Sequence, residues 1–428
     1  MVRRQIDLGI TTPGDGEYGK AMSSAVDYGA WWSYSFQRLS GLELAEGGPF
    51  GGEPVRSTPG NVRLTTFPDR RDWATFAEAY SDPKSGVSVG DEAPVFPTAT
   101  GPVTYTGHDA IASDIANLKS ALSASGAEHG FITSLSPGSA SRIGNQFYTS
   151  EEEFIWACAD AMREEYQAII DAGLILQIDD PSIAENWDQI SPEPTVEDYL
   201  AFTRIRVEAL NHALRGLPED RIRFHLCWGS WHGPHTTDLE FKYLVETMLT
   251  IDAGSYSFEA ANVRHEHEWR VWEDVTLPDG KQIVPGVISH ATNVVEHPEL
   301  VADRIERFAS VVGPENVIAR PTAVSAVAST HRSRGRSSNH SPRAQNWLPG
   351  ASGSRRRTGV VRKKSSRTTP GPSFDGKAID EHLDATCGVL RRNPARSGEL
   401  DQTVHCSPVD LGQQTRFDGS RDQCQRVV

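Results

Sequence analysis

Short apolar strands alternate with capped helices over residues 150–319, and this alternation constrains the fold more than any other feature of the chain. Ser150 and Thr195 are each followed three residues later by an acidic residue, a pattern that opens a helix. Strands that alternate with helices at this pace form a parallel sheet with helices on its faces. The predicted helices span residues 150–173, 195–216 and 298–313, and the predicted strands span 174–178, 223–227, 256–259, 284–290 and 316–319.

The length of this α/β part favours one architecture. About 320 residues suit a (β/α)8 TIM-type barrel better than a doubly wound sheet. We therefore expect residues 1–320 to form one barrel domain.

Composition excludes several classes of protein. The chain has no run of about 18 apolar residues, so no membrane-spanning helix is expected. Its first residues lack the apolar core of a secretory signal. The five cysteines are irregularly spaced and do not indicate a disulfide framework. We therefore expect a cytoplasmic protein without a membrane partner.

Charge divides the chain near residue 320. The net charge is −15, yet residues 1–319 hold 48 acidic and 23 basic side chains, whereas residues 320–428 hold 9 acidic and 19 basic ones. The acidic body argues against a nucleic-acid partner. From Pro321 to Phe374 there are 11 basic residues, 11 serines and no acidic residue.

Three interpretations of this basic tail stay open. It is a low-complexity, disordered segment, or a basic arm for nucleic acid with few aromatic residues for stacking, or a segment translated out of frame. Codons for residues 321–336 can be chosen that, read two bases further on, encode Asp-Cys-Gly-Phe-Ser-Gly-Arg-Val-His-Pro-Gln-Ile-Ala-Trp-Ala-Lys. Only the first base of each shifted codon is free, so chance agreement is poor. We expect residues 321–428 to be frameshifted and disordered.

Polar residues recur at the carboxyl ends of the predicted strands, the edge that holds the active site of a barrel. His225 and Cys227 are two residues apart, so a strand turns both side chains to one face. Imidazole and thiolate bind zinc, and a carboxylate such as Glu259 could be a third ligand. The plainer interpretation is a structural histidine and a buried cysteine that acts as a small hydrophobe. The strand-end residues are Asp179, Asp180, His225, Cys227, Glu259 and His290.

Three further acidic motifs have two interpretations each. Asp179 either caps a helix or contacts a ligand amine or a metal, and Glu185 lies in the loop six residues on. Glu17 ends an Asp-Gly-Glu sequence that marks either a strand-end carboxylate or a turn. The run from His265 to Glu268 looks metal-binding, but we expect it to be a solvated helix face.

Taken together, these residues resemble the catalytic C-terminal barrel of the cobalamin-independent methionine synthase family. The order of the motifs and their strand-end placement agree over residues 3–319. The chain is also similar to the epoxyalkane–coenzyme M transferases of the same superfamily. The matching motifs are Asp15-Gly16-Glu17, Gln177-Ile178-Asp179-Asp180-Pro181 with Glu185, His225-Leu226-Cys227, Ser257-Phe258-Glu259 and Gly286-Val287-Ile288-Ser289-His290.

The resemblance implies zinc-dependent methyl transfer from 5-methyltetrahydropteroyl-glutamate to homocysteine, a step of methionine synthesis. The metal would keep the thiol as a thiolate, which attacks the methyl group on N5 of the folate, and protonation of N5 would improve the leaving group. The substrates would thus be a small-molecule thiol and a methyl-folate. The implied roles are zinc ligation by His225, Cys227 and Glu259, contact with the homocysteine amine by Glu17 and Asp179, contact with the folate by Glu185, and proton transfer by His290.

The chain departs from the family pattern in three places. The second zinc cysteine, in an Asp-Cys-Gly motif after the last strand, is absent, but the shifted frame restores it over the codons of Thr322 and Ala323. The chain begins inside the first helix of the barrel, so we expect a barrel incomplete at both ends. Residues 131–147 hold no folate-stacking tryptophan.

These departures keep two alternative functions open. One is alkyl transfer to another thiol, such as coenzyme M. The other is a non-catalytic product of a frameshifted gene. An opened barrel exposes strand edges, so we expect low solubility and negligible activity of the chain as it stands.

Overall fold

The computed structural model describes residues 1–17, 34–44, 53–82, 84–85, 87, 97–229, 233–289, 292 and 294–321. Residues 1–354 form one compact unit and residues 355–428 a second, which lies wholly outside the described residues. The predicted disordered tail, from residue 322 on, and the predicted proton-transfer residue His290 also lie outside them.

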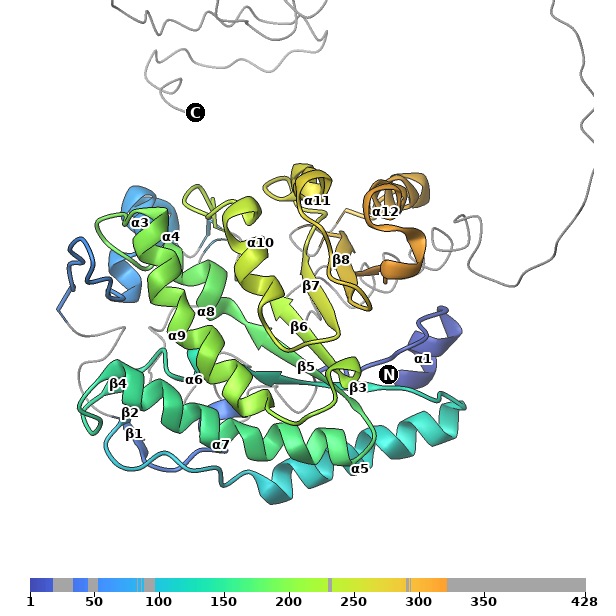
Figure 1. Ribbon diagram of the computed structural model, residues 1–428, viewed down its shortest axis with the longest axis horizontal. Coiled ribbons are helices and arrows are strands. Elements are labelled where there is room, and N and C mark those ends of the chain that lie inside the picture. The colour runs from blue at the N-terminus through green and yellow to red at the C-terminus, as the bar shows by residue number, and fades with distance from the viewer. Residues whose placement is uncertain are drawn as a thin grey trace, which may run out of the picture. The chain divides into compact units, whose positions relative to one another are not determined.

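A six-stranded parallel sheet organises the described residues, in the order β3-β5-β6-β7-β8-β9. Helices flank it, and α5, α7 and α9 lie along the strands β3, β5 and β6 in Figure 1. The strands are β3 (Phe131–Leu135), β5 (Ile175–Asp180), β6 (Ile222–Leu226), β7 (Ser255–Glu259), β8 (Gln282–Ile288) and β9 (Arg320–Pro321). The long helices are α5 (His108–Ser125), α7 (Glu151–Asp171), α9 (Val196–Leu214), α10 (Phe241–Leu249) and α12 (Pro298–Val312).

The predicted α/β class with a parallel sheet is confirmed, whereas the eight-stranded barrel stays a prediction. Beyond β3 the described chain adds one isolated parallel bridge, between Gly14 and Phe131. A separate three-stranded sheet, in the order β1-β2-β4, pairs β1 (Leu42–Leu44) antiparallel with β2 (Pro97–Ala99), and β2 parallel with β4 (Gly144–Asn145).

Short helices connect these elements. They are α1 (Val2–Asp7), η2 (Phe67–Asp69), α3 (Arg71–Thr75), α4 (Ala77–Ser81), α6 (Pro137–Ala140), α8 (Pro181–Ala184), η3 (Glu185–Trp187), η4 (Glu219–Arg221), η5 (Glu266–Arg270), α11 (Val271–Asp274) and η6 (Pro314–Asn316). Glu185, predicted in a loop, thus opens the 3-10 helix η3. None of the described helices is both long and apolar enough to cross a membrane.

Local sequence signals account for the helix starts. Ser150 Oγ accepts the Glu153 N–H at 3.1 Å, and Thr195 Oγ1 accepts the Asp198 N–H at 3.1 Å, so both predicted caps are confirmed.

The predicted strand over residues 316–319 is wrong by a few positions. The side-chain amide of Asn316 donates to the carbonyl of Val312, at the end of α12, and η6 occupies residues 314–316. Val317 makes one isolated bridge, and β9 begins only at Arg320.

Alternation along β5, β6 and β7 separates an apolar face from a polar one. Leu176, Ile178 and Phe224 are fully buried in the core cluster shared with the helices. The residues between them carry polar side chains that meet one another across the strands, such as His225 and Ser257. The opposite face of the sheet is therefore polar, and it carries most of the predicted site residues.

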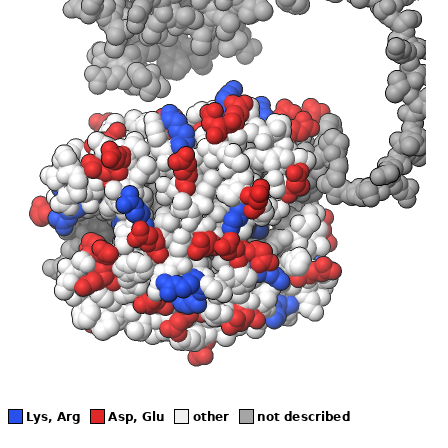
Figure 2. Space-filling model, in the orientation of Figure 1, with Lys and Arg blue, Asp and Glu red and all other residues white. Residues whose placement is uncertain are grey.

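Acidic and basic side chains are interspersed over the face of the molecule drawn in Figure 2. Over residues 1–319 the acidic ones are about twice as frequent as the basic ones.

Candidate metal centre

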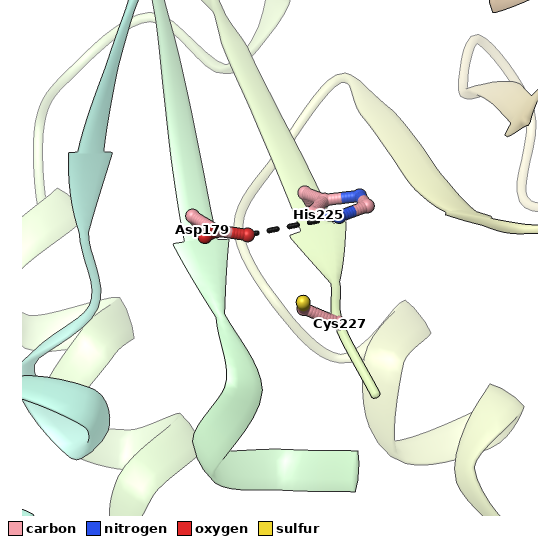
Figure 3. A group of neighbouring side chains, drawn as sticks. All are labelled: Asp179, His225 and Cys227. Carbon is pink, nitrogen blue, oxygen red and sulfur yellow. Dashed lines mark ion pairs between the residues drawn. The ribbon is translucent and has the colours of Figure 1, made fainter. Parts of the chain in front are cut away.

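Asp179, His225 and Cys227 come together at the carboxyl ends of β5 and β6. One ligand atom of each lies within 4.8 Å of the others. Asp179 and His225 are register partners on neighbouring strands, and Cys227 follows the last residue of β6 (Figure 3). His225 Nε2 lies 3.6 Å from Asp179 Oδ1, and His225 and Cys227 are buried. The sequence predicted that His225 and Cys227 would share a face, and the structure places them so.

A hydrogen bond on the far side of the ring orients His225. His225 Nδ1 lies 3.1 Å from Ser257 Oγ on β7, which leaves Nε2 facing Asp179. Arg320 Nη1 donates to the same Ser257 Oγ at 3.1 Å and to Gln177 Oε1 at 2.9 Å. An outer hydrogen bond of this kind fixes the tautomer and direction of a metal-binding imidazole.

The surroundings of Cys227 suit a cation. Burial raises the pKa of the Cys227 thiol well above its usual value, and the charges of Asp179 and Glu259 raise it further. The Gly229 N–H, which donates to Sγ at 3.3 Å, acts in the opposite direction. A metal ion would reverse this balance, because it stabilises the thiolate. One nitrogen, one sulfur and a carboxylate oxygen are a zinc-type donor set, so these residues fit the ion that the sequence implies.

Glu259, the predicted third ligand, lies outside this three-residue group. It ends β7 at the same edge of the sheet, it is buried, and Asn262 Nδ2 donates to its Oε2. Burial raises the pKa of Glu259 to about 7, against the opposing charges of His265 and His235. Asp179 thus contributes the carboxylate of this three-residue group, and ligation by Glu259 stays a prediction.

Glu17 lies in a turn near the same edge. Its N–H donates to Asp15 Oδ1 at 2.8 Å, and its φ of 57° is in the left-handed region. Its side chain is buried. Burial lowers the pKa of Arg320 to about 10, and the charges of Asp179 and Glu17 oppose this shift, so both predicted amine-binding carboxylates lie in the field of one guanidinium.

Glu185 is held by two arginines. Arg70 Nη1 donates to Oε1 at 2.7 Å and Arg142 Nη1 donates to Oε2 at 3.0 Å. Burial opposes ionisation of Glu185, but the two guanidinium groups outweigh it and lower the pKa to about 2. Both arginines are themselves buried. The predicted folate contact is thus a carboxylate whose two oxygens already accept charged hydrogen bonds.

Sequence reasoning missed these arginines and misplaced a second polar group. Arg70 lies 115 positions from Glu185, and no local pattern links the two. The run from His265 to Glu268 is not a solvated face, because His265 and Glu268 are buried and only 3% and 7% exposed. Within that run His267 is exposed.

Comparisons with known proteins support the resemblance. No protein-family model matches the chain. The methionine synthase of Saccharolobus islandicus strain L.S.2.15 is 25% identical over 179 residues, and that of Saccharolobus solfataricus is 22% identical over 180 residues. Each match covers 41% of this chain and 46% of the relative, so the chain spans about half the length of the curated relatives it matches.

Solved structures share the fold. A B12-independent methionine synthase from Shewanella sp. W3-18-1, in complex with selenomethionine, superposes with a TM-score of 0.54 at 17% identity, covering 80% of this chain and 83% of that one. A putative vitamin-B12 independent methionine synthase from Listeria monocytogenes gives 0.51 at 18% identity, covering 81% and 83%. The recognition of a cobalamin-independent methionine synthase-like chain is confirmed by these relatives and neighbours.

Proposed function

We propose that this chain, which is similar to cobalamin-independent methionine synthases, carries a zinc-dependent site for methyl transfer to the thiol of homocysteine from 5-methyltetrahydropteroyl-glutamate. The convergence of Asp179, His225 and Cys227 carries the proposal. Active sites of parallel α/β folds lie at this carboxyl edge of the strands. We place the protein in the cytoplasm, on its cysteine pattern alone.

Four residues are available to hold the metal. His225 would bind through Nε2 and Cys227 through Sγ, with oxygen atoms from Asp179 and Glu259. A zinc ion held by these residues would lower the pKa of a coordinated thiol, so that the acceptor would be a thiolate near neutral pH.

The remaining polar residues would bind the amino acid and move the proton. Glu17 and Asp179 are carboxylates at the same edge; with one Asp179 oxygen on the metal, an ammonium group between Glu17 and the other Asp179 oxygen would gain two charged hydrogen bonds. His290 would supply the proton to N5 of the departing folate. That last assignment rests on the resemblance alone, since His290 lies outside the described residues.

The absence of a folate-stacking tryptophan from residues 131–147 favours a second candidate function. Glu185 does not decide between the two, because each carboxylate oxygen has two lone pairs and one hydrogen bond from an arginine leaves room for a second donor. A donor without a pteridine has no need of a stacking tryptophan. Alkyl transfer to another thiol, such as coenzyme M, is therefore the alternative, and an assay with both pairs of substrates separates the two.

The basic tail bears on whether the chain as it stands is active. We propose that a frameshift near residue 320 removed the second zinc cysteine, which makes a non-catalytic gene product the third candidate. Re-reading the nucleotides across the codons for Asn316 to Val327 tests this directly. A gained or lost base restores Asp-Cys-Gly and supports the frameshift, whereas confirmation of the present frame refutes it.

The activity test compares the 428-residue chain with the same chain continued in the shifted frame. We expect the continued chain, supplied with zinc, to methylate homocysteine, and the 428-residue chain to show negligible turnover. Product formation is followed by mass spectrometry of the thiol. Robust, zinc-stoichiometric methylation by the 428-residue chain would refute its impairment. Failure of the continued chain with every thiol tried would refute the proposed function.

A further inference from the structure

A buried histidine lies between two carboxylates that come from different segments of the chain, Asp238 and Glu268. His265 Nδ1 is 2.7 Å from Glu268 Oε2, and its Nε2 is 3.4 Å from Asp238 Oδ2. Only 3% of His265 is exposed. Asp238 belongs to the loop between β6 and α10, whereas His265 and Glu268 follow β7. One imidazole thus joins the two loops that leave the strands of the candidate site.

The same imidazole contacts the residue next to Cys227. Its ring lies over the indole of Trp228, with centroids 4.3 Å apart, and Trp228 is 1% exposed. Trp228 in turn donates from Nε1 to the carbonyl of Leu239 at 3.1 Å. The backbone after Cys227 is therefore held between His265 and the start of the next helix.

Two hydrogen bonds of Asn262 connect His265 to Glu259. Asn262 Nδ2 donates to Glu259 Oε2, and Asn262 Oδ1 accepts the N–H of His265 at 2.9 Å. One asparagine thus links the carboxylate that ends β7 to the backbone of the histidine. A shift of His265 would move Asn262, and with it the direction of the Glu259 carboxylate.

Glu268 links His265 to the start of helix α10. Its other oxygen, Oε1, accepts the N–H of Phe241 at 2.7 Å, at the first residue of α10. His235 Nδ1 lies 3.2 Å from Asp238 Oδ1, so the second oxygen of Asp238 is engaged as well. The partners of His265 are therefore fixed by contacts of their own.

We propose that His265 is a positioning residue for the candidate metal centre: it ties the loop that follows Cys227 to the loop that follows Glu259, and so sets the separation of these two ligands. It is not a ligand itself, because each ring nitrogen already faces a carboxylate. Burial lowers the pKa of His265, but the hydrogen bonds to Asp238 and Glu268 outweigh it and raise the pKa to about 9. Both nitrogens are then donors at neutral pH.

This inference rests on the proposed metal site, so its test first requires that the unaltered 428-residue chain binds zinc. His265→Ala removes the tie, His265→Asn keeps a donor near the position of Nδ1, and His267→Ala is the matched control, two residues away and exposed. Zinc affinity is measured by competition with a chromophoric chelator. The visible spectrum of the Co²⁺-loaded protein reports the ligand geometry, and the urea midpoint reports folding.

We expect His265→Ala to weaken zinc binding about 10–100-fold, the usual cost of losing an outer-sphere partner. The Co²⁺ ligand-field bands should shift, while the sulfur-to-metal band from Cys227 persists. His265→Asn should recover part of the affinity, and His267→Ala should match the unaltered chain. If His265→Ala does not fold, the Co²⁺ spectrum of His265→Asn is the test. Shifted ligand-field bands then support the proposal, and unchanged bands contradict it.

Two outcomes would overturn the inference. One is a folded His265 variant with unchanged zinc affinity and an unchanged Co²⁺ spectrum. The other is an equal loss in His267→Ala. If the unaltered chain binds no zinc, the inference fails for this chain, and this result is distinguishable from the other two; the proposed function is tested separately, on the chain continued in the shifted frame.

Discussion

At the scale of single residues, Glu185 accepts charged hydrogen bonds from two buried arginines of the candidate site. Its two oxygens accept from Arg70 and Arg142, and Arg142 Nη2 also donates to Gln189 Oε1 at 2.9 Å. Both arginines are buried, and Arg70 Nε also donates to Asp188 Oδ2 at 2.7 Å, so Arg142 depends most on Glu185 for charge compensation. Removing one partner of such a group is more costly than the pair is worth.

We predict that Glu185→Gln lowers the free energy of unfolding by about 3–5 kcal/mol, the usual cost of leaving a buried charge without its partner. The measurement is the urea midpoint. Glu193→Gln is the control, because Glu193 pairs with Arg71 at the surface, and there we expect a loss of about 0–1 kcal/mol. Equal midpoints for the two variants would contradict the account.

The contacts of Glu185 with the two arginines also predict that the stability of the protein depends on pH. The pKa of Glu185 is depressed from 4.5 to about 2 in the folded protein, so the stabilisation is present above pH 4.5. It is lost as the pH falls from 4.5 through 2, because the unfolded chain takes up the proton first. We expect the urea midpoint of the unaltered chain to fall more steeply over this range than that of Glu185→Gln. An equally steep fall of the urea midpoint in both proteins would show that the two arginines do not lower the pKa of Glu185.

At the scale of elements, residues 53–82 pack against loops at the carboxyl edge of the sheet. Thr65 N–H donates to the Gln189 carbonyl at 2.8 Å, and Gln189 Nε2 donates back to the Thr65 carbonyl at 2.8 Å. Asp72, which is 1% exposed, accepts the backbone N–H groups of His235 and Thr236. These contacts join three segments that are far apart in sequence.

We predict that Asp72→Ala loosens this packing, because it leaves the two N–H groups near Asp72 unpaired at about 1–3 kcal/mol each. Amide hydrogen exchange should rise in residues 53–82 and 233–240 together. Glu78→Ala, an exposed change in α4 of the same segment, is the control and should leave exchange unchanged. A rise confined to residues 53–82 would show that Asp72 does not hold the second loop.

The elements also show which parts of the fold the sequence could predict. The starts of α7 and α9 depend on a side chain and an N–H three residues apart, so Ser150 and Thr195 reveal them. His225 and Cys227 share a face because of strand periodicity alone. Arg70 reaches Glu185 across 115 positions, and this contact depends on how residues 53–82 fold back on the sheet. Such long-range pairing leaves no local pattern.

Burial explains the error at residues 265–268, and strand pairing explains why Asp179 joins the metal group. His265 and Glu268 have the spacing of a charged helix face, yet they lie inside because Asp238 and the N–H of Phe241 satisfy them there. Asp179 enters the metal group because it is the register partner of His225, which is a property of strand pairing. The sequence could place both residues at strand ends but could not choose between Asp179 and Glu259 as the nearest carboxylate.

At the scale of the whole molecule, the acidic body and the basic tail make opposite predictions for nucleic acid. Residues 1–319 carry an acidic excess, and the face in Figure 2 shows both signs interspersed. We predict that a chain ending at Pro321 shows no salt-dependent binding to DNA or RNA in fluorescence anisotropy. Binding that weakens steeply with salt and persists without residues 322–428 would contradict this. Nucleic-acid binding that is lost when residues 322–428 are removed would show that the tail is responsible for it.

The central claim is that His225 and Cys227 form a zinc centre with carboxylates at the edge of the sheet. The most direct measurement is the zinc content of the purified 428-residue chain by mass spectrometry, compared between Cys227→Ser and Cys158→Ser. Cys158 is also a free, buried cysteine, but it lies in α7. The account predicts one zinc ion per chain that Cys227→Ser loses and Cys158→Ser keeps. Equal zinc content in both variants, or none in the unaltered chain, would contradict it.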